Sequence, residues 1–188
     1  IIYELMSRLS DELSSCLILR YFSHFNKYDE IALLLGVPIG TVRSRLAAAR
    51  EKLSKLYHQT DDAGDRALNQ SNKWSSYYQH VWTHIYDDHL SRNEFFNHLN
   101  PMLNVRFTSG KSGNGRGIFE KEINDDLTFG SRFNVKQIAS CGNISVVEGI
   151  NSNNIEYPDR CSPSSVFVVF RQSEKISDFH IFDSSRII

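Results

Sequence analysis

Small polar side chains and arginines alternate along residues 39–57, and their types and spacing suit contacts with DNA. At helical spacing Ser44 points away from the apolar stripe of this segment, and Thr41 lies beside it. Arg43 and Arg45 lie to either side. Arginine suits phosphates and guanine edges, whereas small central residues let a helix backbone approach the floor of the major groove. The segment therefore predicts a helix that reads DNA.

Two shorter helices and a tight turn are predicted to position this reading helix. Ser10 can cap a first helix, and Asn26 can cap a second one over residues 27–35. Gly36 permits the left-handed turn that ends the second helix. The third helix is predicted to bury six apolar residues: Ile39, Val42, Leu46, Ala49, Leu53 and Leu56. This order is typical of a helix-turn-helix, although an ordinary three-helix bundle with solvated arginines shares the same spacing.

The sequence from Tyr28 to Leu53, YDEIALLLGVPIGTVRSRLAAAREKL, resembles region 4 of bacterial extracytoplasmic-function sigma factors. The resemblance covers residues 1–57. It implies a domain that reads the minus 35 promoter element and contacts the β flap of core RNA polymerase, with sigma region 2 expected upstream of Ile1 and absent from this chain. The positions expected to contact DNA are Lys27, Tyr28, Thr41, Arg43, Ser44, Arg45 and Arg50.

The polar residues 58–72 are predicted to be a flexible linker between two domains, 1–57 and 73–188. In the second domain an aromatic helix is expected from residue 73 to about Leu90, and Ser91 and Glu94 are spaced as a capping box for the next helix. Further elements are predicted as a helix and strands: 103–108, 118–127 (helical), 132–140, 144–151, 165–172 and 176–183. The expected fold class is an all-α helix-turn-helix followed by an α+β cone-shaped domain with a curved antiparallel sheet.

The second domain resembles the SnoaL-like branch of the nuclear transport factor 2 (NTF2)-like fold. The resemblance is carried by the aromatic first helix, by Gly115-Arg116-Gly117 before the third helix, and by the hairpin over 166–183. Together the two resemblances indicate a sigma factor with a fused SnoaL-like domain that regulates it. Such folds enclose a pocket, which leaves a small-molecule ligand open. The expected pocket residues are Trp74, Tyr78, Trp82, Phe107, Phe179 and Asp183.

Three other patterns could indicate phosphate binding, metal binding or catalysis, and each is rejected. The glycine-rich segment 109–117 lacks the order of a phosphate-binding loop. His80, His84 and Asp88 have a spacing that could hold a metal, but the sequence offers no fourth ligand and a solvated face is favoured. In a strand, Asp183 and His180 point to opposite faces, which does not support a paired general base. We expect no metal, no cofactor and no enzymatic activity.

Composition agrees with a soluble, cytoplasmic protein that has no membrane partner. The net charge is −1, and the three cysteines have no disulfide or metal spacing. No apolar run reaches the length of a membrane span, and no signal peptide is evident. Two alternatives stay open: a small-ligand-binding or isomerase-like domain attached to a helix-turn-helix, and a repressor with a ligand domain. A buried carboxylate with a raised pKa would favour an enzyme, and an apolar or plugged pocket would favour a scaffold.

Overall fold

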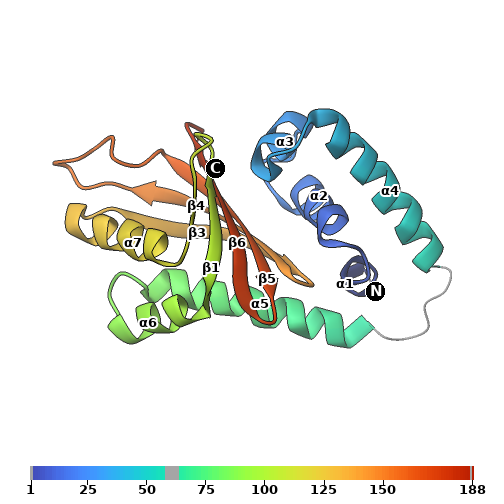
Figure 1. The fold of residues 1–188 in the computed structure, drawn as a ribbon, viewed down its shortest axis with the longest axis horizontal. Coiled ribbons are helices and arrows are strands. Elements are labelled where there is room, and N and C mark those ends of the chain that lie inside the picture. The colour runs from blue at the N-terminus through green and yellow to red at the C-terminus, as the bar shows by residue number, and fades with distance from the viewer. Residues whose placement is uncertain (1, 58–63, 187) are drawn as a thin grey trace. The chain divides into compact units, whose positions relative to one another are not determined.

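A computed structural model of the chain describes residues 2–57, 64–186 and 188. The first part is entirely helical (Figure 1). Its four helices are α1 (Ile2–Ser7), α2 (Asp11–Phe22), α3 (Tyr28–Leu35) and α4 (Ile39–Tyr57). The predicted order of short helix, turn and long helix is confirmed for α3 and α4.

Apolar residues at helical spacing form the core of this helical part. Those of α4 are buried at Val42, Leu46 and Ala49. The predicted stripe is shorter than expected, because Ile39 is 42% exposed and Leu53 and Leu56 are half-buried. Gly36 has a φ of 65°, the left-handed conformation expected of it. The cap of α3 differs from the prediction. Helix α3 begins one residue later than expected, with Lys27 as its N-cap and the Glu30 carboxylate accepting from its backbone N–H at 3.1 Å.

Helix α5 (Gly64–His84) begins inside the expected linker, and this is a correction. Residues 58–63 lie outside the described residues, but 64–72 are helical. Ala67 and Ser71 are buried at the spacing of Trp74 and Tyr78, so they continue the aromatic stripe with small side chains. The Ser71 hydroxyl also donates to the carbonyl of Ser140. Small buried residues in a polar sequence are easily read as a linker.

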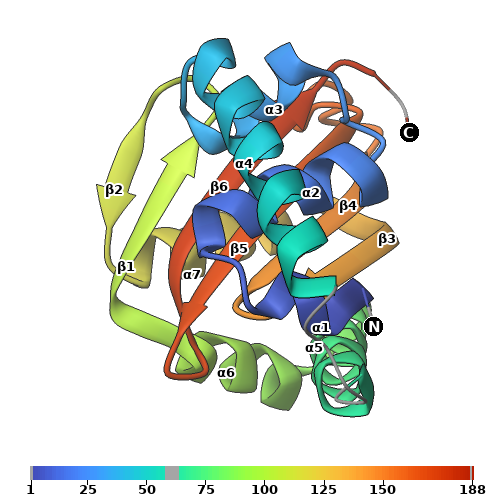
Figure 2. The same cartoon turned by 90° about the vertical axis from the view of Figure 1, so that its right-hand side faces the viewer.

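The remaining elements form a six-stranded sheet with two further helices. They are α6 (His89–His98), β1 (Leu99–Phe107), β2 (Ser112–Asn114), α7 (Gly117–Phe129), β3 (Arg132–Cys141), β4 (Ile144–Ser152), β5 (Ser164–Gln172) and β6 (Lys175–Ser184). The strand order is β2-β1-β6-β5-β4-β3, and Figure 2 shows the strands in this order from left to right, with the sheet seen face on. All five predicted strands and the helix near 118–127 are confirmed within a few residues. Strand β2 was not predicted.

The sheet is mixed, whereas a purely antiparallel one was expected. β1 pairs with β6 in parallel, with Val105 opposite Phe179, while β5 and β6 are antiparallel. Only hairpin neighbours must be antiparallel. Because β1 and β6 are separated by a helix and four strands of the sheet, the local sequence does not set their relative direction.

Contacts within the chain define two compact units, Ile1–Ser76 with Ala139–Val146, and Tyr77–Ile138 with Val147–Ile188. In the second unit, aromatic side chains of two helices pack on one face of the sheet. Phe119 of α7 lies 4.4 Å from Phe179 of β6, and Trp82 of α5 lies 5.1 Å from Phe167 of β5, between ring centroids. The domain boundaries at 57 and 73 stay predictions.

Candidate functional site

The exposed face of α4 agrees with the prediction at its centre and on one flank. Arg43 and Ser44 are exposed, and the Ser44 hydroxyl donates to the Thr41 carbonyl at 3.0 Å, which keeps this small side chain close to the helix. Ala48 is exposed beside them. Apart from its chain neighbours and the backbone of its own helix, no described atom lies within 4 Å of a Cβ built at Gly40, so the start of this face is open. The geometry suits close approach to a nucleic-acid groove.

Arg45 lies differently from Arg43. It is half-buried, and its charge acts on α2. The pKa of Glu12 is lowered mainly by hydrogen bonds from its own backbone and Ser10, and further by the charge of Arg45. Burial raises the pKa of the Cys16 thiol, and the charge and a hydrogen bond of Arg45 partly offset that rise. Arg45 therefore lies against α2 and is partly exposed, and its predicted DNA contact stays a prediction.

Arg50 is held by a tyrosine that the sequence reading did not consider. Its Nε and Nη2 atoms donate to the Tyr21 hydroxyl at 3.2 and 3.0 Å, and this contact raises the pKa of the guanidinium. Tyr28 is half-buried under Arg20, whose guanidinium carbon lies 5.2 Å from the ring centroid. Lys27 is exposed. Arg43 is thus an exposed arginine with its side chain on the small-residue face.

A cavity of about 240 Å³ lies in the second unit, where α5 and α7 cover the sheet. One part of its wall is apolar and largely aromatic: Trp82, Phe107, Phe119, Ile123, Phe133, Phe167 and Ile181. The other part is polar or charged: Tyr86, Glu122, Asp126, Asn151, Arg160, Cys161, Ser162, Ser165 and Asp183. A mixed wall of this kind is typical of small-molecule sites.

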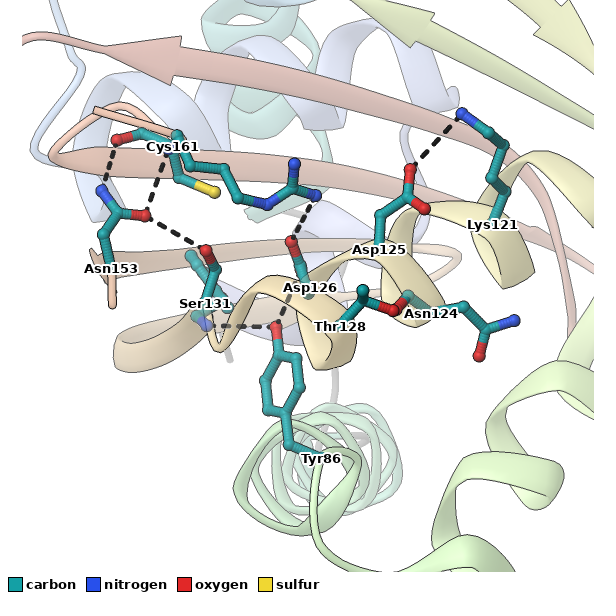
Figure 3. A network of polar contacts seen from close by, with 11 residues as sticks. Tyr86, Lys121, Asn124, Asp125, Asp126, Thr128, Ser131, Asn153 and Cys161 are labelled. Carbon is teal, nitrogen blue, oxygen red and sulfur yellow. Dashed lines mark hydrogen bonds and ion pairs between the residues drawn. The ribbon is translucent and has the colours of Figure 1, made fainter. Parts of the chain in front are cut away.

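Asp126, on α7, is the most perturbed acid of the cavity (Figure 3). Burial raises its pKa from 3.8 to about 6, and the negative charge of Glu122 adds to the rise, while Arg160 and Tyr86 oppose it. Its carboxylate lies 3.5 Å from Arg160 Nη2 and accepts from the Tyr86 hydroxyl at 3.4 Å. The Tyr86 oxygen in turn accepts from the Phe133 backbone N–H at 3.1 Å. The pocket therefore contains a largely buried carboxylate that titrates near neutral pH.

The structure places half of the six predicted pocket residues in the cavity wall. Trp82, Phe107 and Asp183 line the cavity. Trp74, Tyr78 and Phe179 are instead buried in the core outside it, and the Tyr78 hydroxyl accepts from Arg171 at 3.2 Å. They were expected in the pocket because aromatic residues on a helical stripe look alike in the sequence, whichever layer they face.

Asp126 lines the cavity but was not among the pocket residues predicted from the sequence. Phe119, Ile123 and Asp126 are spaced by four and three residues, so they share one face of α7. An acidic residue that continues an apolar stripe is the signal that could have identified Asp126. Arg160 lies in a loop, and no periodicity connects it to this face.

The patterns set aside in the sequence have ordinary structural roles. α5 ends at His84, so Asp88 is not on its face but caps α6 by accepting from the backbone N–H groups of Leu90 and Ser91. In the described part of the chain, no group of three or more His, Cys, Asp or Glu side chains is placed to hold a metal. The glycine-rich segment contains β2, which pairs antiparallel with β1.

Comparison with known proteins gives a match for the helical part of the chain and for the part that contains the sheet. Residues 1–53 match the family model described as sigma-70, region 4. Among solved structures, a candidate ketosteroid isomerase from Kribbella flavida DSM 17836 is similar with a TM-score of 0.51 and 10% identity, covering 63% of this chain and 82% of that one. An NTF2-like protein of unknown function from Burkholderia xenovorans LB400 is similar with a TM-score of 0.46 and 15% identity, and the match covers 60% of this chain and 84% of that one. A search of curated proteins gave no match.

These findings confirm the sequence-based recognition and the fold class. The chain carries a sigma-70 region 4 domain at its start. The mixed six-stranded sheet with its helices has the NTF2-like, SnoaL-like cone fold. Among the described helices none is by itself both long and apolar enough to cross a membrane; α3 and α4, bent by 100° at their junction, meet that test only as a pair.

Proposed function

We propose that this chain is part of a sigma factor in which the helical domain binds the minus 35 promoter element and core RNA polymerase. The observation that carries the proposal is the match of residues 1–53 to sigma-70 region 4. The exposed face of α4 supports it, because Arg43 and Ser44 face solvent beside small residues. Such a protein acts in the cytoplasm, where the polymerase is, and it is a transcription factor rather than an enzyme.

The NTF2-like domain is proposed to regulate the sigma factor. Region 4 needs no second domain in order to read DNA, so a fused cone-shaped domain must serve another purpose. Contact with the upstream half of the factor is favoured over electrostatic cover of α4, because acidic side chains such as Asp125, Glu148 and Glu156 are dispersed along its sequence. A marked gain in DNA affinity for residues 1–57 over the whole chain, abolished by salt, would favour cover instead.

Promoter recognition is tested with DNA selected by the intact chain from a randomised duplex pool. Arg43→Ala is expected to lower affinity by about 1 to 3 kcal/mol if Arg43 reads a base, or to flatten the salt dependence by about one unit if it binds a phosphate. Arg66 is an exposed arginine of α5, and Arg66→Ala is the matched control. This variant should change neither the DNA affinity nor its salt dependence. Equal binding by both variants at all salt concentrations would refute the assignment. Capture of core polymerase by the chain separates a sigma factor from a repressor.

One observation favours a second candidate function, an isomerase-like activity. The cavity holds Asp126, whose pKa of about 6 suits a general acid or base at neutral pH. The test is exchange of α-protons of a small ketone in heavy water, followed by NMR. Catalysed exchange that Asp126→Asn abolishes would support this activity, and exchange at the rate of buffer would exclude it for that substrate.

A further inference from the structure

Hydrogen-bond partners are unevenly distributed among the polar groups of the cavity, and three of these groups have partners within the protein. Asp183 accepts from the Ser165 hydroxyl at 2.8 Å. The Asn151 amide nitrogen donates to the Ser162 carbonyl and to the Ser165 hydroxyl, both at 2.7 Å. Asp126 has Tyr86 and Arg160. These polar groups do not require a ligand.

Two buried donors of the same cavity wall are not satisfied. Within the described part of the chain, no hydrogen-bond acceptor is found for Trp82 Nε1 or for Arg160 Nε. Trp82 is only 4% exposed. A buried N–H group without an acceptor costs about 1 to 3 kcal/mol, and native proteins retain few of them without a reason. Trp82 also borders a second cavity of about 200 Å³, but only the larger cavity is lined by both side chains.

The charged residues of the cavity wall restrict which class of ligand could accept hydrogen bonds from these two donors. Glu122, Asp126 and Asp183 line the cavity against a single cation, Arg160. An anion entering there would face more negative than positive charge in a poorly solvated site. The volume of about 240 Å³ is below the roughly 300 to 1,000 Å³ of sites for drug-sized molecules, and much of the wall is aromatic. A cation is disfavoured as well, because the two unsatisfied groups are N–H donors and one of them belongs to Arg160, which is itself positively charged. We therefore infer a ligand that is small, uncharged and largely apolar.

We propose that this cavity binds a small, uncharged ring compound with a carbonyl or ether oxygen, which accepts hydrogen bonds from Trp82 Nε1 and Arg160 Nε. The aromatic wall covers the ring of the ligand. The cavity thereby gives the NTF2-like domain a chemical signal to respond to. The binding step does not depend on DNA recognition by α4, so failure of one leaves the other standing.

The test uses four probes that share one bicyclic ring system and differ in a single group. Tetralone carries a carbonyl, tetralin has no polar group, tetralin carboxylate is an anion and aminotetralin is a cation. The intact chain is labelled with nitrogen-15, and its two tryptophan indole N–H resonances are followed by NMR. Trp82 reports on the cavity, and Trp74, which does not line it, is the internal reference.

Tetralone should shift the Trp82 resonance, leave that of Trp74 in place, and bind about three- to tenfold more tightly than tetralin, as one hydrogen bond would give. Tetralin carboxylate and aminotetralin should bind more weakly than tetralone. Equal affinity for tetralone and tetralin, tighter binding of either charged probe, or no response of Trp82 would each overturn the proposal.

Variants locate the two donors. Trp82→Phe keeps an aromatic ring but removes the N–H, and Arg160→Lys keeps the positive charge beside Asp126 but removes Nε. Each should reduce the preference for tetralone over tetralin, measured by ligand-observed NMR, whereas Trp74→Phe should leave it unchanged. Retention of the full preference in both folded variants would refute the assigned contacts, and the titrations of the unmodified chain decide the matter if a variant does not fold.

Discussion

Replacing Asp126 by Asn should change how the stability of the NTF2-like domain depends on pH. The pKa of this carboxyl is raised from 3.8 to about 6 in the folded protein, so the folded state holds the proton more tightly than the unfolded chain does. The stability that this proton contributes is complete below pH 3.8 and is lost as the pH rises through about 6. Asn does not titrate. The difference in unfolding free energy between the unmodified protein and Asp126→Asn therefore reports the contribution of the Asp126 carboxyl alone.

The size of the effect follows from the pKa shift. A shift of that size corresponds to at most about 3 kcal/mol, at about 1.4 kcal/mol for each pKa unit. The side chain is 21% exposed, and solvent screening reduces the value. We expect the unfolding free energy of the unmodified protein, relative to Asp126→Asn, to fall by about 1 to 2 kcal/mol between about pH 4 and pH 7.

Urea unfolding of the intact chain at a series of pH values measures this difference. Both tryptophans lie on α5, so their fluorescence reports on this domain. Asp125→Asn is the matched control, since Asp125 is the neighbouring carboxylate on α7 and lies 3.4 Å from Lys121 toward solvent. A difference between Asp126→Asn and the unmodified protein that stays flat or increases with pH would refute the reasoning.

Three further predictions concern stability and can be checked by thermal unfolding. Gly149→Ala should cost about 1 to 3 kcal/mol, because a Cβ there would lie 2.5 Å from a backbone oxygen and a phenyl ring; an unchanged midpoint would contradict this. Arg45→Ala should destabilise the helical part by about 1 kcal/mol, since its stem and charge pack against α2, whereas Arg43→Ala should not. Residues 64–188 should unfold at a higher temperature than residues 73–188, which lack the buried start of α5; equal midpoints would show that this helical turn adds nothing.

The parts of the fold that the sequence predicted are those fixed by local patterns. The spacing of apolar residues and the positions of turn residues located α4, the turn at Gly36 and five of the six strands. The parallel pairing of β1 with β6 could not be predicted, because it depends on contacts between distant segments. The start of α5 was missed because burial there involves Ala67 and Ser71, which carry no apolar signal of their own.

The candidate site divides in the same way. Arg43 and Ser44 were placed correctly on an exposed face, because helical periodicity alone decides which side they occupy. The packing of Arg45 on α2 and of Arg50 on Tyr21 depends on how long side chains fold back on neighbouring helices, which spacing does not reveal. In the cavity, Asp126 and Arg160 meet only after a helix and a distant loop have both packed on the sheet.

The position of β6 also sets the order in which the two domains can form during synthesis. β6 is the last strand in sequence, yet it lies inside the sheet between β1 and β5. Its partners in β1 are more than seventy positions earlier, as Asn104 with Asp178 shows. Such distant pairing slows folding, and domains generally form as units while the chain is being made. A ribosome carrying this chain would therefore hold the completed helices α1 to α4 well before the sheet of the NTF2-like domain could close.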